Sequence, residues 1–236
     1  MPKVSVVIPV KDCASTIEKS MSSVLEQTYE DFEVIVVDNL CEDETIPKVK
    51  AFKDTRIKII QCNTPGIVPA LNTGLQNVSS ALIARQDGDD FWYPEKLEKQ
   101  VNLLESNSEI DICGTQIRLM NPDGSVKDDS FRYPTEDVPM KSWLLTGRNS
   151  LAHPSVVFRK SILLRTGGYD DTYPIAEDHH LWLRCIRWFN FCNIDEVLLD
   201  YNSSHNPRYD PMYPKLASES QFRTLQHMGI IGTRKD

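Results

Sequence analysis

Three acidic side chains stand close together in the tetrapeptide Asp87-Gly88-Asp89-Asp90. Neighbouring carboxylates repel one another unless a cation neutralises them. Gly88 allows the backbone to turn so that alternate side chains can approach one centre. Oxygen ligands suit Mg²⁺ or Mn²⁺, which complete their coordination with substrate phosphates. The cluster therefore predicts a divalent metal bridging carboxylates to a diphosphate; a solvated acidic turn is the alternative that its composition leaves open.

A second acidic pair, Glu177-Asp178, opens a predicted helical segment. A carboxylate at this place can serve as a general base, but acidic residues also occur in first helical turns simply to cap the helix. Catalysis and capping both remain open from the dipeptide alone. His179 and His180 follow directly. Adjacent helical residues face directions about 100° apart, so the pair cannot readily share one ion, and we expect at least one at the surface.

Aromatic residues and one further histidine are candidates for contact with a ligand. Trp92 and Tyr93 follow the acidic cluster and could contact a ligand or simply pack. His153 precedes a short predicted strand and could line the ligand site or be a partly buried loop residue. We expect Trp182 and Trp188 to pack in the core.

The elements that must position these residues alternate in the first half of the chain. Buried strands are predicted at residues 4–10, 33–38, 56–61 and 81–86, and helical patterns at 17–25, 42–52 and 67–77. This alternation predicts a parallel sheet built from right-handed βαβ units. The acidic cluster follows the fourth strand, at the edge of the sheet where ligands bind in open α/β folds.

The second half has a mixed α+β pattern. A helix is predicted to start at Pro94, followed by a hairpin whose strands, 110–120 and 125–129, flank the turn at 121–124. Later elements are a helix at 135–146, a strand at 155–159, a helix at 177–190, a strand at 191–201 and a helix near 214–228. No linker or repeat separates the halves, so we expect them to pack as one unit.

Composition narrows the class of protein. The 236 residues carry a formal net charge of −8, with 40% hydrophobic and 25% charged residues. This balance argues against a nucleic-acid partner. The six cysteines have irregular spacing and no CxxC pair, which favours reduced thiols. With no signal-peptide pattern and no apolar stretch of about 18 residues, we expect a cytoplasmic protein, with peripheral membrane association left open.

Seven stretches together resemble family 2 glycosyltransferases, which have the GT-A fold. In family order they are residues 4–12 (VSVVIPVKD), 34–38 (VIVVD), 66–75 (GIVPALNTGL), 83–90 (IARQDGDD), 153–160 (HPSVVFRK), 167–184 (GGYDDTYPIAEDHHLWLR) and 198–201 (LLDY). The ordered set covers nearly the whole chain. The resemblance implies a Rossmann-like, mostly parallel sheet with helices on both faces, plus a mixed α+β acceptor half. The expected division is a donor half at 1–90, an acceptor and catalytic half at 91–205 and a tail at 206–236, all in one domain.

The resemblance also implies an activity and a set of site residues. It implies an inverting hexosyl- or N-acetylhexosaminyl-transferase that uses Mn²⁺ or Mg²⁺ and moves a sugar from a nucleotide sugar, often a UDP-sugar, to a hydroxyl of a glycan, a lipid-linked molecule or a protein. Asp178 matches the catalytic base, with Glu177 beside it, and Asp89 matches the metal ligand, with Asp90 beside it. The expected donor-site residues are Pro9, Val10, Asp12, Asp38, Asn72, Arg85, Asp87 and Gly88. The expected acceptor-side residues are Trp92, Tyr93 and His153.

Two stretches depart from the family pattern. The family usually has Asp-Asp-Gly-Ser after the second strand, where this chain has Asp38-Asn39-Leu40-Cys41. The family often has Tyr-Arg-x-His near the end, where this chain has Tyr201-Asn202-Ser203-Ser204-His205, without the arginine and with one extra residue. His205 is therefore a candidate metal or phosphate contact that the departure leaves open.

Two other classes of protein are alternatives. A sugar nucleotidyltransferase would also use a parallel sheet and paired carboxylates, but it needs a Gly-rich, basic phosphate loop after the first strand, where this chain has VKDCAST. A non-catalytic nucleotide-sugar-binding module is suggested by the altered loop after Asp38. The intact Asp89 and Asp178 argue against it.

Overall fold

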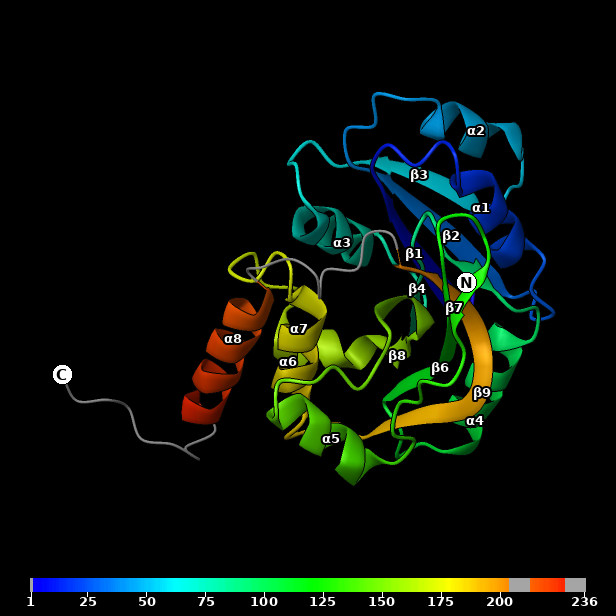
Figure 1. Ribbon diagram of the computed structural model, residues 1–236. Coiled ribbons are helices and arrows are strands. Elements are labelled where there is room, and N and C mark those ends of the chain that lie inside the picture. Colours follow the sequence, from blue (N-terminus) through cyan, green and yellow to red (C-terminus); the bar gives the residue numbers. More distant parts are fainter. Residues whose placement is uncertain (1, 204–212, 228–236) are drawn as a thin grey trace.

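The computed structural model describes residues 2–203 and 213–227. The sheet has nine strands in the order β3-β2-β1-β4-β8-β6-β9-β5, with β7 paired to β6. The strands are β1 (Val4–Val10), β2 (Phe32–Asp38), β3 (Ile57–Gln61), β4 (Leu82–Arg85), β5 (Phe91–Trp92), β6 (Ile112–Met120), β7 (Val126–Asp128), β8 (Val157–Arg159) and β9 (Phe191–Asn202). The helices are α1 (Ile17–Leu25), α2 (Thr45–Ala51), α3 (Ile67–Gln76), α4 (Lys96–Ser106), α5 (Asp137–Leu145), α6 (Leu163–Thr166), α7 (Glu177–Cys185) and α8 (Tyr213–His227), with short 3₁₀ turns at His153–Ser155 and Lys160–Ile162. Figure 1 shows these elements along the chain.

The first half is the predicted parallel sheet. β1 lies between β2 and β4, and β3 pairs with β2, all in parallel register. The order therefore reverses between β1 and β4, and the crevice beside such a reversal is where α/β folds bind ligands. Val10 lies opposite Asp38 in the register, so the ends of β1 and β2 meet at one edge.

The second half continues the same sheet with mixed strand directions. β8 runs antiparallel to both β4 and β6, while the long β9 runs parallel to β6. The predicted hairpin is present, since β6 pairs antiparallel with β7. One sheet therefore runs through both halves, and its uninterrupted run of four parallel strands, β3-β2-β1-β4, belongs to the first half.

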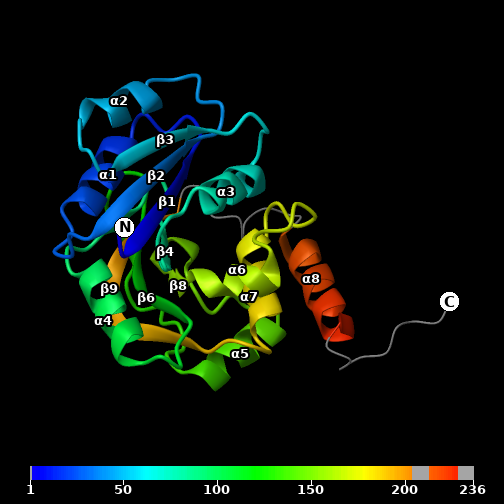
Figure 2. The ribbon, with the colours of Figure 1, turned by 180° about the vertical axis from the view of Figure 1, so that it is seen from behind.

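Alternating residues of the buried strands face two hydrophobic cores. Val6 and Val34 belong to the core beneath α1, α2 and α4, whereas Val7 and Ile35 belong to the core beneath α3, α5, α6 and α7. This period of two is the geometry of a strand buried on both faces. Figures 1 and 2 show the two helical layers from opposite sides, with α8 packed outside α7.

Several expected boundaries need correction. The strand expected at 155–159 begins only at Val157, because His153–Ser155 is a 3₁₀ turn. The helix expected at 177–190 ends at Cys185, and Phe91–Trp92, for which no strand was expected, pairs antiparallel with β9. Among the described residues, no helix is both long enough and apolar enough to cross a bilayer.

Candidate active site

The carboxyl end of β4 opens onto a cavity of about 460 Å³, which we call the main cavity. Its walls come from both halves of the chain, because the segment after β4 meets the start of α7 and the ends of β6 and β9. The volume lies in the range of ordinary ligand sites. The lining includes five of the acidic residues that the sequence singled out, Asp87, Asp89, Asp90, Glu177 and Asp178, but not Asp12 or Asp38.

The three aspartates of the tetrapeptide come together as predicted. Their carboxylate oxygens lie within 4.8 Å of one another, close enough to share one cation. A Cβ atom on Gly88 would lie 2.7 Å from Sγ of Cys13, so glycine lets the turn pack against the loop after β1.

Asp90 is the most enclosed member of the cluster. Its side chain is 2% exposed, and Oδ1 accepts a hydrogen bond of 2.7 Å from the amide of Asn202. Oδ2 is buried and has no partner among the described residues. Burial, together with the charges of Asp87 and Asp89, raises the pKa of Asp90 well above its usual range. A divalent cation would give the buried Oδ2 a partner and would also neutralise the repulsion among the three carboxylates.

Arg85 brings a buried positive charge to the same edge. Its guanidinium forms an ion pair with Asp87 while only 4% of the residue is exposed. Burial opposes the charged form, but the Asp87 carboxylate outweighs that effect and raises the pKa of Arg85. The guanidinium therefore remains a permanent cation beside the aspartates, in a place where it can contact an anionic ligand.

Glu177 and Asp178 form the first turn of α7, where the helix N-terminus favours negative charge. Oδ1 of Asp178 accepts the amide hydrogen of His179 at 2.6 Å, and Oδ2 accepts the side-chain amide of Asn149 at 2.5 Å. Glu177 is more enclosed than Asp178, since only 8% of the residue is exposed. Burial and the neighbouring Asp178 charge raise the pKa of Glu177 to about 8, so its carboxyl group is mostly protonated at neutral pH.

His153 links this turn to the rest of the cavity wall. Its Nδ1 lies 3.6 Å from Oε1 of Glu177, and its Nε2 shares a hydrogen bond of 2.8 Å with the hydroxyl of Tyr169. Burial and the nearby Arg85 charge lower the pKa of His153 well below its usual range. A neutral imidazole at this position is a hydrogen-bonding group of the cavity wall.

A second cavity, of about 430 Å³, lies at the ends of β1 and β2. Pro9, Val10, Asn39 and Leu40 line it, and Ile67 lines both this cavity and the main one. The shared residue makes the two cavities neighbours along the carboxyl edge of the sheet. The loop after Asp38 therefore lines a pocket, although its sequence departs from the family pattern.

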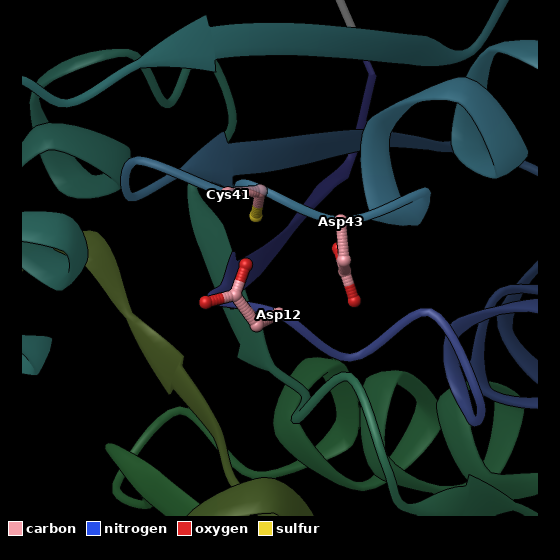
Figure 3. Close-up of side chains that lie close together, drawn as sticks. All are labelled: Asp12, Cys41 and Asp43. Atoms are coloured by element: carbon pink, nitrogen blue, oxygen red, sulfur yellow. The ribbon is translucent and has the colours of Figure 1, made fainter.

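Asp12 and Asp38 organise the loops beside this second cavity. Oδ1 of Asp12 accepts the amide of Glu42 at 2.7 Å, and Oδ1 of Asp38 accepts the amide of Cys41 at 2.9 Å. Figure 3 shows Asp12 together with Cys41 and Asp43, whose ligand atoms lie within 4.8 Å of one another. Asp12 and Asp43 are exposed, and their carboxylates already hold loop amides, so we assign no ion to this group.

Several expected contacts lie elsewhere. Trp92 is completely buried and donates its indole N–H to the carbonyl of Pro154, so it packs in the core instead of contacting a ligand. The hydroxyl of Tyr93 bonds to Asp200, and Tyr93 does not line the main cavity. The amide of Asn72 exchanges two hydrogen bonds of 2.9 Å with the backbone of Tyr169, and Asn72 lines neither cavity. His205 lies outside the described residues.

The expectations for the neighbouring histidines and tryptophans are also partly wrong. His179 and His180 are both buried. Nε2 of His179 lies 3.2 Å from the carbonyl oxygen of Leu144 in α5, and the ring of Tyr173 packs against His180 with centroids 4.1 Å apart. Trp182 is in the core as expected, whereas Trp188 is 52% exposed.

Sequence patterns did not indicate some cavity residues. Asn149, Phe131 and Tyr133 line the main cavity from segments without regular secondary structure. Such segments show no periodicity, and nothing local marks an asparagine as the partner of a carboxylate 29 residues later.

Comparisons with known proteins agree on the kind of fold and chemistry. Residues 5–165 match the protein family described as Glycosyl transferase family 2. The O-antigen biosynthesis glycosyltransferase WbnJ of Escherichia coli is 34% identical over 207 residues, which cover 84% of this chain and 78% of WbnJ.

Solved structures share the architecture. The crystal structure of S. aureus TarS 1–349 in complex with UDP-GlcNAc superposes with a TM-score of 0.75 at 18% identity, covering 95% of this chain and 66% of that chain. The mannosyltransferase PcManGT from Pyrobaculum calidifontis, in complex with GDP-Man and Mn²⁺, gives a TM-score of 0.68 at 18% identity, covering 98% of this chain and 76% of that one. At these identities the likeness establishes a shared GT-A fold.

Proposed function

This chain belongs to glycosyl transferase family 2, and we propose that it is an inverting, metal-dependent enzyme that transfers a sugar from a UDP-sugar to an acceptor hydroxyl. One observation carries the proposal. The carboxylate cluster of Asp87, Asp89 and Asp90 lines the same cavity as Asp178 at the start of α7. A site for the leaving diphosphate and a base for the acceptor are thereby within one enclosure.

The donor occupies both cavities in this proposal. The base and ribose lie in the second cavity, between the loops that follow β1 and β2, and the diphosphate passes Ile67 to reach the aspartates. Arg85 and Asp87 contact the donor beside the metal. TarS in complex with UDP-GlcNAc and PcManGT with GDP-Man and Mn²⁺ support a nucleotide sugar and a divalent cation on this fold.

Asp89 and Asp90 would hold the metal, with Asp87 beside them. A divalent cation supplies a Lewis acid that stabilises the charge of the departing diphosphate. The buried Oδ2 of Asp90, which has no partner among the described residues, is the feature of this chain that fits such an ion.

Asp178 is the proposed base. It takes the proton of the acceptor hydroxyl as that oxygen forms a bond to the anomeric carbon, and the bond from this carbon to the diphosphate oxygen breaks with its electron pair leaving on the diphosphate. A single displacement of this kind inverts the configuration. A retaining mechanism needs a carboxylate nucleophile as well, and Glu177, with its pKa near 8, is mostly protonated at neutral pH.

The test is a thermal-shift panel of UDP- and GDP-sugars with and without Mn²⁺. A ligand at about 100 times its Kd stabilises the native state by about 2.7 kcal/mol, which gives a clear shift. We expect a UDP-sugar to raise the melting temperature only when Mn²⁺ is present, and Asp89→Ala to remove that effect. Asp31→Asn, at an exposed position at the other end of β2 from the second cavity, is the control and should keep it. An unchanged metal-dependent shift in Asp89→Ala would contradict the metal site.

A further inference from the structure

Three aromatic side chains form a group beside the main cavity that the proposed mechanism does not use. The rings of Phe131 and Tyr133 meet edge to face with centroids 4.8 Å apart, and Trp143 of α5 lies 6.3 Å from Phe131. Phe131 and Tyr133 line the cavity. We call these three residues the aromatic wall. Ile117 and Leu119 of β6 extend its apolar surface within the same cavity.

The part of the aromatic wall formed by Phe131 and Tyr133 is held in place although its segment has no regular secondary structure. The buried side chain of Gln116 accepts a hydrogen bond from the amide of Tyr133 at 2.8 Å and donates one to its carbonyl at 3.0 Å. Asn193 donates to the carbonyl of Pro134 at 2.7 Å. Both side chains are at most 5% exposed, so these bonds are shielded from water. The wall is therefore a fixed surface, which is what a binding site needs.

The same cavity also presents polar groups. Asn149 and Asp178 line it, and the Asn149 amide nitrogen is committed to Asp178. Oδ1 of Asn149 is buried and has no partner among the described residues. An unpaired buried acceptor costs free energy until a donor reaches it. A ligand hydroxyl beside the reacting one would supply that donor.

An apolar ring surface combined with hydrogen-bond acceptors matches the surface of a pyranose. The C–H groups of a sugar ring can pack on an aromatic face, while its hydroxyls bond to amide and carboxylate oxygens. A protein hydroxyl on a flexible side chain would not need a fixed aromatic surface. The cavity therefore favours a saccharide as acceptor.

A cation stands at the outer end of the aromatic wall. The guanidinium carbon of Arg148 lies 4.2 Å from the ring centroid of Trp143, and Arg148 immediately precedes Asn149 in the chain. Its side chain is exposed, and it forms no ion pair with any residue in 2–203 or 213–227. A guanidinium held by stacking keeps its N–H groups available for phosphate or carboxylate.

We propose that the acceptor is a saccharide that carries an anionic group, with its ring packed on Phe131 and its anion paired with Arg148. The proposal rests on the proposed function, because it assigns the second substrate of the same cavity. Phosphate and carboxylate share this chemistry, and the experiment separates them.

The experiment measures binding to the protein loaded with UDP and Mg²⁺. The probes are the 1-phosphates and the neutral methyl glycosides of glucose, galactose, N-acetylglucosamine and N-acetylgalactosamine, with methyl glucuronoside as the carboxylate arm. Dissociation constants come from saturation-transfer NMR titrations. For at least one sugar, the anionic form should bind about tenfold more tightly than the neutral form, as expected for a charge-assisted hydrogen bond. If the phosphate or the carboxylate probe shows this tighter binding, that probe identifies the anionic group of the acceptor.

Matched variants connect the effect to the residues. Arg148→Gln should remove the preference for the anion and leave the neutral glycoside unchanged. Arg165→Gln is the control, since Arg165 is likewise exposed and stacked on a tryptophan, at 4.3 Å from Trp188, which is not part of the aromatic wall. Phe131→Leu keeps an apolar side chain for folding and should weaken the charged and the neutral forms of the sugar alike.

Three results would overturn the proposal: equal affinity for charged and neutral forms, an equal effect of Arg148→Gln and Arg165→Gln, or binding of no saccharide in any arm. Each is distinct from failure of the proposed function, which would appear as UDP binding that does not depend on metal or on Asp89.

Discussion

The side-chain amide of Asn149 donates a 2.5 Å hydrogen bond to Oδ2 of Asp178, and both residues line the main cavity. The amide of His179 holds the other oxygen of Asp178 at 2.6 Å. The proposed base is thus fixed by one bond from its own helix and one from the loop before the short 3₁₀ turn.

Asp178→Asn should lower turnover by a factor on the order of 10² or more, because the variant cannot remove the acceptor proton. Donor affinity should change little, since Asp178 is assigned to the acceptor. The checks are initial rates with a UDP-sugar identified by thermal shift, and calorimetric titration of UDP with Mn²⁺. Transfer at the parental rate would assign the base to another residue.

Asn149→Ala should lower kcat between roughly tenfold and a hundredfold while leaving the KM for the donor unchanged. The reason is a loss of orientation, because a small displacement of a catalytic group is costly. Asn107→Ala, at an exposed position after α4, is the matched control. A rise in donor KM with unchanged kcat would place Asn149 in the donor site instead.

Glu177→Gln should flatten the dependence of stability on pH. The folded-state pKa of Glu177 is raised from 4.5 to about 8. Between these values the folded protein holds a proton that the unfolded chain releases, so stability is full below pH 4.5 and falls as pH rises towards 8. The contribution approaches about 1.4 kcal/mol per pH unit. Urea unfolding of the metal-free protein from pH 5 to 8 measures it.

The control for this prediction is Glu98→Gln, at an exposed position in α4, which should keep the parental slope. If Glu177→Gln also keeps that slope, the pH dependence comes from another buried group, and Asp90 is the first candidate.

Asp90→Asn should weaken Mn²⁺ binding roughly tenfold or more, in line with the sensitivity of metal sites to nearby substitutions. The metal-free variant should be at least as stable as the parent, because the change removes a buried charge that Asp87 and Asp89 repel. Melting temperatures across a Mn²⁺ titration test both statements. Asp31→Asn, at an exposed site, should behave as the parent in both respects. Parental Mn²⁺ affinity in Asp90→Asn would remove Asp90 from the ligand set.

Gly88→Ala should destabilise the fold by about 1–3 kcal/mol, the usual cost of overpacking. The added methyl group would lie 2.7 Å from Sγ of Cys13 and 3.4 Å from Cγ1 of Val10. Removing the sulfur with Cys13→Ala should restore much of the loss, giving a favourable coupling in a double-mutant cycle measured by urea unfolding. Additive effects would show that the contact does not determine the cost.

Sequence patterns predicted the first half of the fold well because buried strands and amphipathic helices leave periodic signals. β1 was expected with the same limits, Val4–Val10, and the acidic cluster was expected at the end of β4. The hairpin of β6 and β7 was also anticipated from the turn at 121–124. These features are local, and local pattern is what a single sequence carries.

The features that sequence could not supply depend on distant contacts. Trp92 stands next to the acidic cluster in sequence, yet pairing of β5 with β9 turns its indole into the core. His179 and His180 were expected to include a surface residue, but they are covered by segments that only the tertiary fold brings there. Asn149, Phe131 and Tyr133 lie on irregular segments held by Gln116 and Asn193, side chains that reveal their role only when the strands are assembled.

The paired hydrogen bonds between the Asn72 side chain and the Tyr169 backbone affect how this chain can be recombined with its relatives. Two hydrogen bonds of 2.9 Å join α3 to the loop before α7, and a Cβ atom on Gly168 would lie 2.6 Å from Oδ1 of Asn72. In a chimera that takes its acceptor half from another transferase, α3 and the loop before α7 come from different parents, so the hydrogen bonds between Asn72 and Tyr169 are lost unless the second parent has matching residues. Swaps that move Asn72 together with Gly168 and Tyr169 should yield folded hybrids, whereas a crossover near residue 90 between mismatched parents should not.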